Sequence, residues 1–149
     1  MSNIYFYVLI ALLAGAMMTT QAATNNKMAA FVNGPPLAAF LSFLVGTVAL
    51  LLYAVLSRIP LGNLMGAKDA PAVAWLGGLL GVFFVMAALI LVPKFGVAMT
   101  FSFMIAGQMI ATLVIDHFGL LGIEVRPVSW TRITGILLIS GGVALIRKF

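Results

Sequence analysis

Long apolar runs separated by short polar segments make up almost the whole chain. Each run reaches the roughly 20 residues that a helix needs to cross the hydrocarbon core of a membrane. The runs are continuous and do not alternate between apolar and polar positions, so they disfavour a membrane β-barrel. The pattern predicts an all-α membrane protein, one transmembrane domain over residues 1–149 with five helices. The predicted helices cover residues 4–23, 36–57, 71–92, 95–115 and 129–146.

Local signals support the boundaries of these helices. The sequence Asn-Gly-Pro-Pro at 33–36 opens the second helix, because proline in the first turn loses no hydrogen bond. Asp69 precedes the third helix, where a carboxylate favours the N-terminus. A polar loop is expected over residues 58–70. Only Pro93-Lys94 and their neighbours separate the third and fourth helices, so a tight hairpin is expected there.

Composition supports the prediction of a membrane protein and favours membrane lipid over nucleic acid as a partner. The chain is 64% hydrophobic and 7% charged, with a mean hydropathy of +1.22, whereas soluble domains carry about 25% charged residues. The net charge of +5 comes from scattered basic residues, which argues against nucleic acid as a partner. Lys and Arg at helix ends instead predict contact with membrane lipid. The chain has no cysteine, and no cofactor is expected.

The basic residues divide evenly between the two sides that five crossings would define. One side holds Arg58, Lys68, Arg126 and Arg132, and the other holds Lys27, Lys94, Arg147 and Lys148. An excess of Lys and Arg normally fixes the orientation of a membrane protein, and an even division gives no such bias. The division predicts dual topology, with the chain working as an antiparallel pair and its two termini on opposite sides. No Lys or Arg precedes the first run, so we expect it to be a span and not a cleaved signal peptide.

Two amides lie one turn apart on the first predicted helix. Gln21 and Asn25 share a face with Met17. Polar side chains are costly in hydrocarbon and therefore face a cavity or another helix. One interpretation is a substrate path bordered by adaptable methionines. The other is hydrogen bonding between helices.

The fourth predicted helix carries a second polar stripe. Met104, Gln108 and Thr112 follow one another at four-residue spacing and point toward Asp116. We expect both stripes to line one substrate cavity, formed by Gln21, Asn25, Gln108, Thr112, Met17 and Met104. Asp116 and His117 would lie at its mouth, where they either relay a proton, since histidine changes charge near neutral pH, or are simply hydrated at the helix end. One His beside one Asp offers too few ligands for a metal.

Glycine pairs suggest where helices meet closely. Gly77 and Gly81 on the third helix, and Gly135 and Gly142 on the fifth, are predicted to form the dimer interface, because small residues let helix backbones approach. Packing inside one protomer is the alternative. No Asp or Glu lies in the middle of a span, which argues against a cation exporter with a buried carboxylate. No catalytic motif is present, so an enzyme is not expected.

Three segments resemble the signature of a known family. Pro93-Lys-Phe-Gly96, Ile105-Ala-Gly-Gln108 and Leu113-Val-Ile-Asp-His-Phe-Gly119 are similar to the YdcZ-like five-helix proteins of the drug/metabolite transporter (DMT) superfamily. Gly15, Gln21 and Asn25 resemble that family's first helix. The segment Gly135 to Val143 is similar to the dimerising last helix of small multidrug exporters. These exporters use a first-helix glutamate where this chain has Gln21 and Asn25, so cationic drug export is not carried over.

The resemblance implies a multi-pass protein of the bacterial inner membrane that pairs antiparallel. The pair would be a homodimer, a heterodimer with a sister chain, or a fused tandem, and the even charge division favours the homodimer. The expected function is secondary transport of a small neutral or zwitterionic polar solute by alternating access in an inverted dimer. A non-transporting assembly or regulatory subunit and a passive pore are the alternatives.

Overall fold

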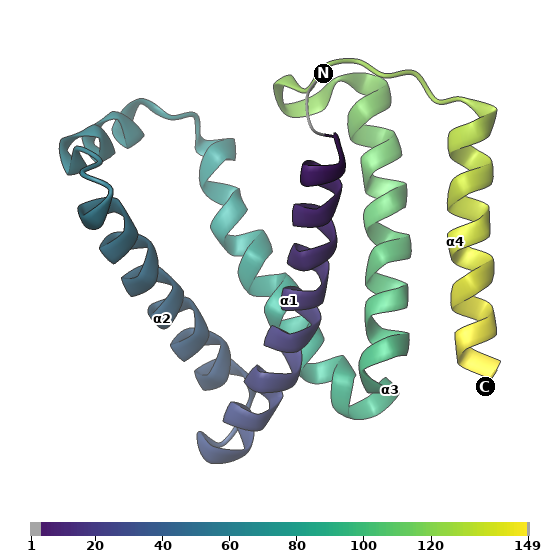
Figure 1. The fold of residues 1–149 in the computed structure, drawn as a ribbon, viewed down its shortest axis with the longest axis horizontal. Helices are drawn as coiled ribbons and strands as arrows, with labels where there is room; N and C mark the ends of the chain where they lie inside the picture. Colours follow the sequence, from purple (N-terminus) through teal and green to yellow (C-terminus); the bar gives the residue numbers. More distant parts are fainter. Residues whose placement is uncertain (1–3, 149) are drawn as a thin grey trace. The chain divides into compact units, whose positions relative to one another are not determined.

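All the regular secondary structure in the part of the chain that the structure describes is helical. The computed structural model describes residues 4–148, except the side chains of 140, 143, 144 and 146–148. The elements are α1 (Ile4–Phe31), α2 (Pro35–Leu56), η1 (Leu61–Asp69), α3 (Ala72–Phe118), η2 (Leu120–Gly122) and α4 (Trp130–Lys148), as Figure 1 shows. The prediction of an all-α protein is confirmed for these residues. They form two compact units, residues 1–93 and 94–149.

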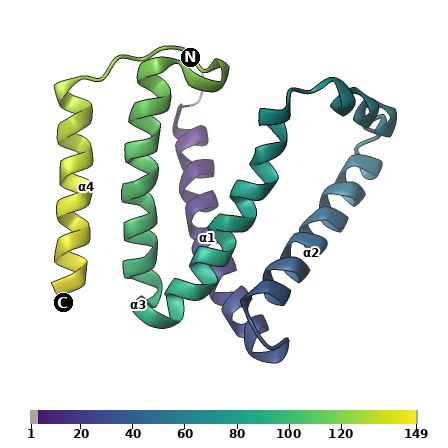
Figure 2. The ribbon, with the colours of Figure 1, turned by 180° about the vertical axis from the view of Figure 1, so that it is seen from behind.

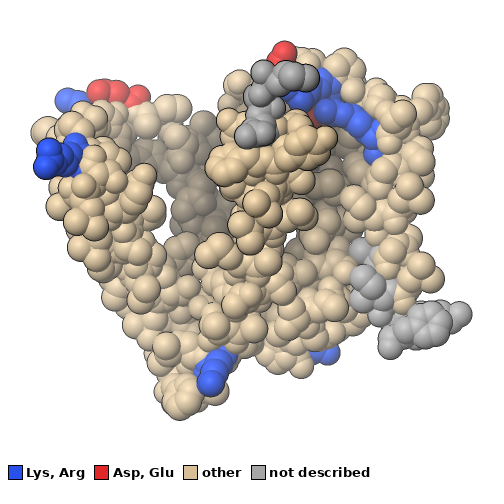
Figure 3. Space-filling model, viewed as in Figure 1, with Lys and Arg blue, Asp and Glu red and all other residues tan. Residues whose placement is uncertain are grey.

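Three of the helices are long and apolar enough to cross a membrane, namely α1, α2 and α3. Large apolar side chains are exposed along every helix, among them Leu9, Leu51, Leu80 and Leu138. Charged side chains lie near helix ends on the face drawn in Figure 3, and the long middle parts there are free of them. An apolar surface of this extent is suited to lipid and not to water.

Helix α1 continues two turns beyond the predicted end at residue 23. Thr24 Oγ1 donates to the Gln21 carbonyl oxygen at 2.9 Å, and Asn26 Nδ2 donates to the Ala22 carbonyl oxygen at 3.0 Å. These polar side chains therefore satisfy themselves on their own helix and do not break it. The helix ends where Asn33 takes a left-handed conformation (φ 61°) and the Gly34 N–H donates to the Ala29 carbonyl oxygen at 3.0 Å.

Helix α2 begins at Pro35, within the proline pair that predicted its start. It runs antiparallel to α1 and contacts it. Two small residues of α2, Ala38 and Ala39, are buried together with Leu89 of α3 and form the core of the first unit. Small side chains at this point let the helices approach closely.

The segment that was expected to be a polar loop contains the 3₁₀ helix η1. Arg58 is left-handed (φ 55°), and the Ile59 N–H donates to the Ala54 carbonyl oxygen at 2.9 Å, which ends α2. The Asn63 N–H then donates to the Pro60 carbonyl oxygen at 3.1 Å. Short-range bonds of this kind close a 3₁₀ helix without the apolar periodicity on which the prediction depended.

Helix α3 takes in both the third and the fourth predicted helices. It has 47 residues and is interrupted at Gly96 (φ 77°, ψ 168°), while Pro93 lies inside the helix. The break was expected at Pro93-Lys94. Proline has a φ compatible with a helix, whereas the positive φ of the break is one that glycine adopts readily. The boundary between the two units falls after Pro93, and the predicted hairpin stays a prediction.

The second unit pairs the C-terminal part of α3 with α4. The two helices run antiparallel and side by side, joined by residues 119–129 and η2 (Figure 2). Helix α4 begins one residue after the predicted start. Arg147 and Lys148, which enter the charge count above, have side chains outside the described residues.

Candidate functional site

A pocket of about 440 Å³ lies between α1, α2 and the first part of α3, wholly within residues 1–93. Its polar lining is Gln21 of α1 and Ser42 and Thr47 of α2. The remaining lining residues are Met18, Phe43, Gly46, Leu50, Gly81, Phe84 and Val85. No lining residue carries a charge. Gln21 was predicted as a site residue, and the structure places it here.

The polar lining offers neutral donors and acceptors. Thr47 Oγ1 donates to the Phe43 carbonyl oxygen at 2.8 Å, so its oxygen still has acceptor capacity. The Gln21 amide can both donate and accept. Sequence reasoning missed Ser42 and Thr47 because each is an isolated small polar residue in an apolar run. Ser42 and Gly46 are four residues apart and therefore share a face of the helix, which was the signal that could have found this side of the pocket.

Asn25 lies one turn beyond Gln21 on α1. It is 8% exposed, and its Nδ2 has no hydrogen-bond partner among the described residues. A buried amide donor without a partner costs about 1–3 kcal/mol. The Asn25 amide is thus a buried donor that remains available to hydrogen-bond a ligand. Of the predicted methionines, Met17 is 71% exposed and does not line the pocket, whereas its neighbour Met18 does.

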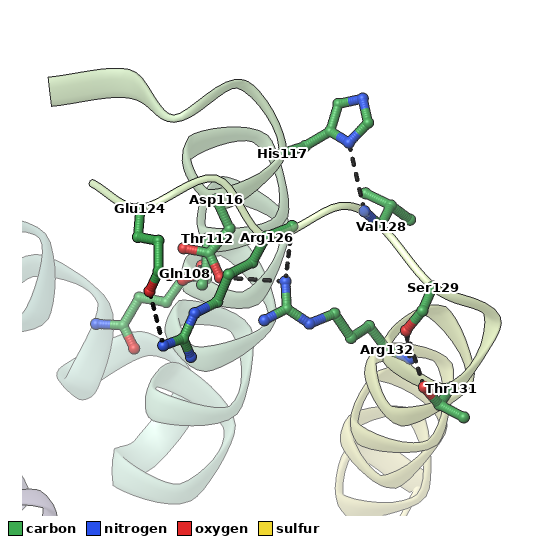
Figure 4. Close-up of polar contacts among 10 residues, drawn as sticks. All are labelled: Gln108, Thr112, Asp116, His117, Glu124, Arg126, Val128, Ser129, Thr131 and Arg132. Carbon is green, nitrogen blue, oxygen red and sulfur yellow. Dashed lines mark hydrogen bonds and ion pairs between the residues drawn. The ribbon is translucent and has the colours of Figure 1, made fainter. Parts of the chain in front are cut away.

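Only part of the second polar stripe, which runs from Met104 to Asp116, lines a pocket. Thr112 and Asp116 line a pocket of about 240 Å³ between α3 and α4, wholly within residues 94–149. Gln108 is outside this lining and its side chain extends away from α4 (Figure 4). Met104 is half-buried and is also outside the lining. Thr112 Oγ1 donates to the Gln108 carbonyl oxygen at 2.8 Å, so this hydroxyl needs no other acceptor.

Asp116 and His117 have separate partners. Asp116 Oδ2 is 3.2 Å from Arg132 Nη1 of α4, and that nitrogen also donates to the Arg126 carbonyl oxygen at 3.1 Å. His117 Nδ1 accepts from the Val128 N–H at 3.3 Å (Figure 4). These contacts fasten the segment 119–129 to the end of α3. The proton role predicted for Asp116 and His117 stays a prediction.

Comparison with known proteins identifies the family. The family model described as "Putative inner membrane exporter, YdcZ" matches residues 6–145. The chain belongs to the YdcZ family. The resemblance inferred from the segments between Pro93 and Gly119 is therefore confirmed. Searches of curated proteins and of solved structures gave no match.

Membership of the YdcZ family agrees with the fold. The description of the family is that of an inner-membrane exporter family, and the structure has three long apolar helices. This YdcZ-family protein is accordingly a multi-pass protein of the inner membrane. No group of three or more potential metal ligands occurs among the described residues.

The glycines that were predicted at a dimer interface have different surroundings in this YdcZ-family protein. A Cβ at Gly81 would lie 3.7 Å from the Phe43 ring of the same unit, whereas Gly77 and Gly142 face open space. Gly135 lines the pocket between α3 and α4. The dimer interface stays a prediction. The convergence of Gln21 and Asn25 with Gln108 and Thr112 also stays a prediction, because the two pairs belong to different units.

Proposed function

We propose that this YdcZ-family protein exports a small polar solute without net charge. The pocket of residues 1–93 carries the proposal, because Gln21, Ser42 and Thr47 supply neutral hydrogen-bonding groups and no lining residue is charged. A solute with a net charge would leave that charge unpaired in an apolar surrounding, at high cost. The unpartnered amide of Asn25, one turn away, supports the same chemistry.

We further propose that the chain crosses the membrane five times. A straight helix of 47 residues would be about 70 Å long, more than twice the hydrocarbon thickness of about 30 Å. The break at Gly96 supports two crossings by α3, one before and one after it. Helix α4, with 19 residues, would be about 28 Å long and would supply the fifth crossing.

The proposed working unit is an antiparallel homodimer. The even division of basic residues supports insertion in both orientations. Two inverted copies would present equivalent pockets to opposite sides of the membrane, the arrangement on which alternating access depends.

The test is transport by purified protein in lipid vesicles. Flux is measured for polyols, sugars, small amides, zwitterionic amino acids and organic cations. The variant Gln21→Leu removes the pocket amide, and Thr20→Val is its control. Thr20 is a neighbouring exposed residue outside the pocket, and its hydroxyl donates to the Ala16 carbonyl oxygen at 2.9 Å.

We expect saturable flux of an uncharged or zwitterionic solute. Gln21→Leu should reduce it about tenfold or more, since an unmet polar group costs about 1–3 kcal/mol and about 1.4 kcal/mol corresponds to tenfold. Thr20→Val should have little effect. Flux of organic cations alone would contradict the proposal. Flux that does not saturate would indicate a passive pore, and no flux of any solute by a folded protein would favour a non-transporting subunit.

A further inference from the structure

The pocket between α3 and α4 is polar at one end and apolar along the rest of its length. Asp116 and Arg132 form the polar end. The apolar lining is Met109, Leu113, Gly135, Ile136 and Ile139, and Thr112 adds only a hydroxyl that already donates to its own helix. Its volume of about 240 Å³ is below the range of about 300–1,000 Å³ that is typical of drug-sized ligands. Polar chemistry at one end of an apolar slot favours an amphiphile over a water-soluble solute.

The polar end lies at the ends of both helices. Asp116 is two residues before the last residue of α3, and Arg132 is two residues after the first residue of α4. In a membrane-spanning pair of helices these positions are at headgroup depth. The slot extends from there to Met109, seven residues or about 10 Å along the helix. An acyl chain that descends from a headgroup follows the same direction.

The ion pair of Asp116 and Arg132 still has hydrogen-bonding atoms with which it could bind one anionic and one cationic group of a ligand. Both contacts of the Arg132 guanidinium use Nη1, and the contact of Asp116 uses Oδ2 (Figure 4). A guanidinium has five N–H donors, and a carboxylate has two acceptor oxygens. A headgroup phosphate could therefore accept from the remaining donors of Arg132 while an ammonium donates to Asp116. A head with only one charge would match only one member of the pair.

We propose that this pocket binds a zwitterionic phospholipid whose headgroup carries a primary ammonium. The phosphate lies on Arg132, the ammonium lies on Asp116, and one acyl chain occupies the slot down to Met109 and Ile139. A primary ammonium is required because it has three N–H donors for the carboxylate, whereas a quaternary ammonium has none. The site is independent of the solute pocket in residues 1–93.

The first test is competition among lipids of identical acyl chains. Purified, delipidated protein is titrated with phosphatidylethanolamine, phosphatidylcholine and phosphatidylglycerol, and retained lipid is counted by native mass spectrometry. We expect phosphatidylethanolamine to bind about fivefold more tightly than either of the others, the change that one ordinary hydrogen bond gives. Equal binding of all three, or strongest binding of phosphatidylglycerol, would overturn the proposal. So would displacement of the lipid by an equal concentration of glycerophosphoethanolamine, which has the head but no acyl chain.

The second test uses variants of the pocket. Asp116→Asn should reduce the preference for the primary ammonium, and Arg132→Gln should weaken retention of all three lipids. Gly135→Leu keeps the ion pair and fills the slot, since a Cβ at Gly135 meets no atom within 4 Å, and it should weaken all three as well. This variant keeps the proposal testable if changes to the ion pair prevent folding.

The control is the neighbouring ion pair of Glu124 and Arg126, which are 3.4 Å apart and have side chains 81% and 65% exposed. Both lie outside the pocket lining. Glu124→Gln and Arg126→Gln should leave the lipid preference unchanged. If they altered it as much as Asp116→Asn, binding would be a general effect of surface charge and the proposed site would be wrong.

Discussion

At the scale of single residues, many polar side chains in the spans are satisfied on their own helix, whereas the buried Asn25 Nδ2 and Thr100 Oγ1 have no hydrogen-bond partner among the described residues. Six threonines donate their hydroxyls to backbone carbonyl oxygens of their own helices. They are Thr19, Thr20, Thr24, Thr47, Thr112 and Thr134. These residues are satisfied in hydrocarbon without a second helix. Gln21, which lines the pocket, and Asn25, whose Nδ2 has no partner among the described residues, are therefore better candidates for solute chemistry than the threonines outside the pocket.

Asn25 allows this role to be tested against stability. Asn25→Leu removes a buried amide whose Nδ2 has no partner among the described residues. It should not lower thermal stability in detergent, because replacing an unmet polar group by an apolar one is neutral or stabilising. It should reduce solute flux about fivefold or more. Stability is measured by unfolding in detergent and flux in vesicles.

Asn26→Leu is the matched control for Asn25→Leu. Asn26 Nδ2 donates to the Ala22 carbonyl oxygen at 3.0 Å. This change should leave flux largely intact. A marked loss of stability in Asn25→Leu would mean that the amide has a structural role that the proposal omits.

At the scale of elements, the connection after α3 depends on glycine. Gly119 and Gly122 both have positive φ, 60° and 78°. A Cβ at Gly119 would also lie 2.6 Å from Val125 Cγ2 and 3.2 Å from the Ile123 carbonyl oxygen, whereas a Cβ at Gly122 meets nothing within 4 Å. Both positions thus need a residue that tolerates a positive φ, but only Gly119 lacks room for a side chain.

This difference gives a prediction for two alanine variants. Gly122→Ala should cost about 1–2 kcal/mol for the left-handed conformation alone. Gly119→Ala should cost more, because Val125 must also move. The midpoints of thermal unfolding in detergent provide the comparison. Equal midpoints would show that the segment 119–125 adapts freely to the added methyl group.

Helix boundaries could be predicted from the sequence where hydrophobic length and proline set them, as at the start of α2. The extension of α1 could not be predicted, because it depends on hydrogen bonds from side chains to the backbone. The helix η1 could not be predicted either, because its turns leave no mark in the apolar periodicity. The break in α3 was expected near Pro93 and falls at Gly96, where backbone conformation decides. Among the site residues, Gln21 could be predicted because it is an amide in an apolar run.

The role of Arg132 could not be predicted, because its pairing with Asp116 depends on how residues 119–129 fold back toward α3.

At the scale of the whole molecule, the proposed dual topology depends on the even division of basic residues. The positions Asn63, Leu64 and Met65 in η1 lie outside the spans and are exposed. Changing all three to lysine should give the chain a single orientation, because it places an excess of positive charge on one side. Reporter fusions at the C-terminus should report both sides for the original chain and one side for the variant.

The lysine variant should also lose transport when it is expressed alone. Transport should return when a copy with the opposite bias is co-expressed. A reporter signal on one side only for the original chain would rule out dual topology.

The predicted dimer contact is tested at Gly142. A Cβ there meets nothing within 4 Å in the described chain, so Gly142→Leu should not disturb the protomer. If a second copy approaches this position, the added side chain should push the helices apart and lower the dimer fraction in detergent. Gly142→Ala is a milder companion variant. An unchanged dimer fraction would place the contact elsewhere.

The apolar lengths of the first two helices have a consequence for the surrounding bilayer. Helix α1 has 28 residues and α2 has 22, or about 42 Å and about 33 Å at the usual rise. The apolar run of α1 covers residues 4–23 and that of α2 covers residues 36–57, so the two spans match closely in apolar length, and the turns that α1 adds beyond residue 23 carry Thr24, Asn26 and Lys27. A bilayer whose hydrocarbon is thicker or thinner than these apolar runs costs fractions of a kcal/mol per Å of mismatch. Vesicles made from a series of acyl-chain lengths should therefore show an optimum thickness for this protein's activity.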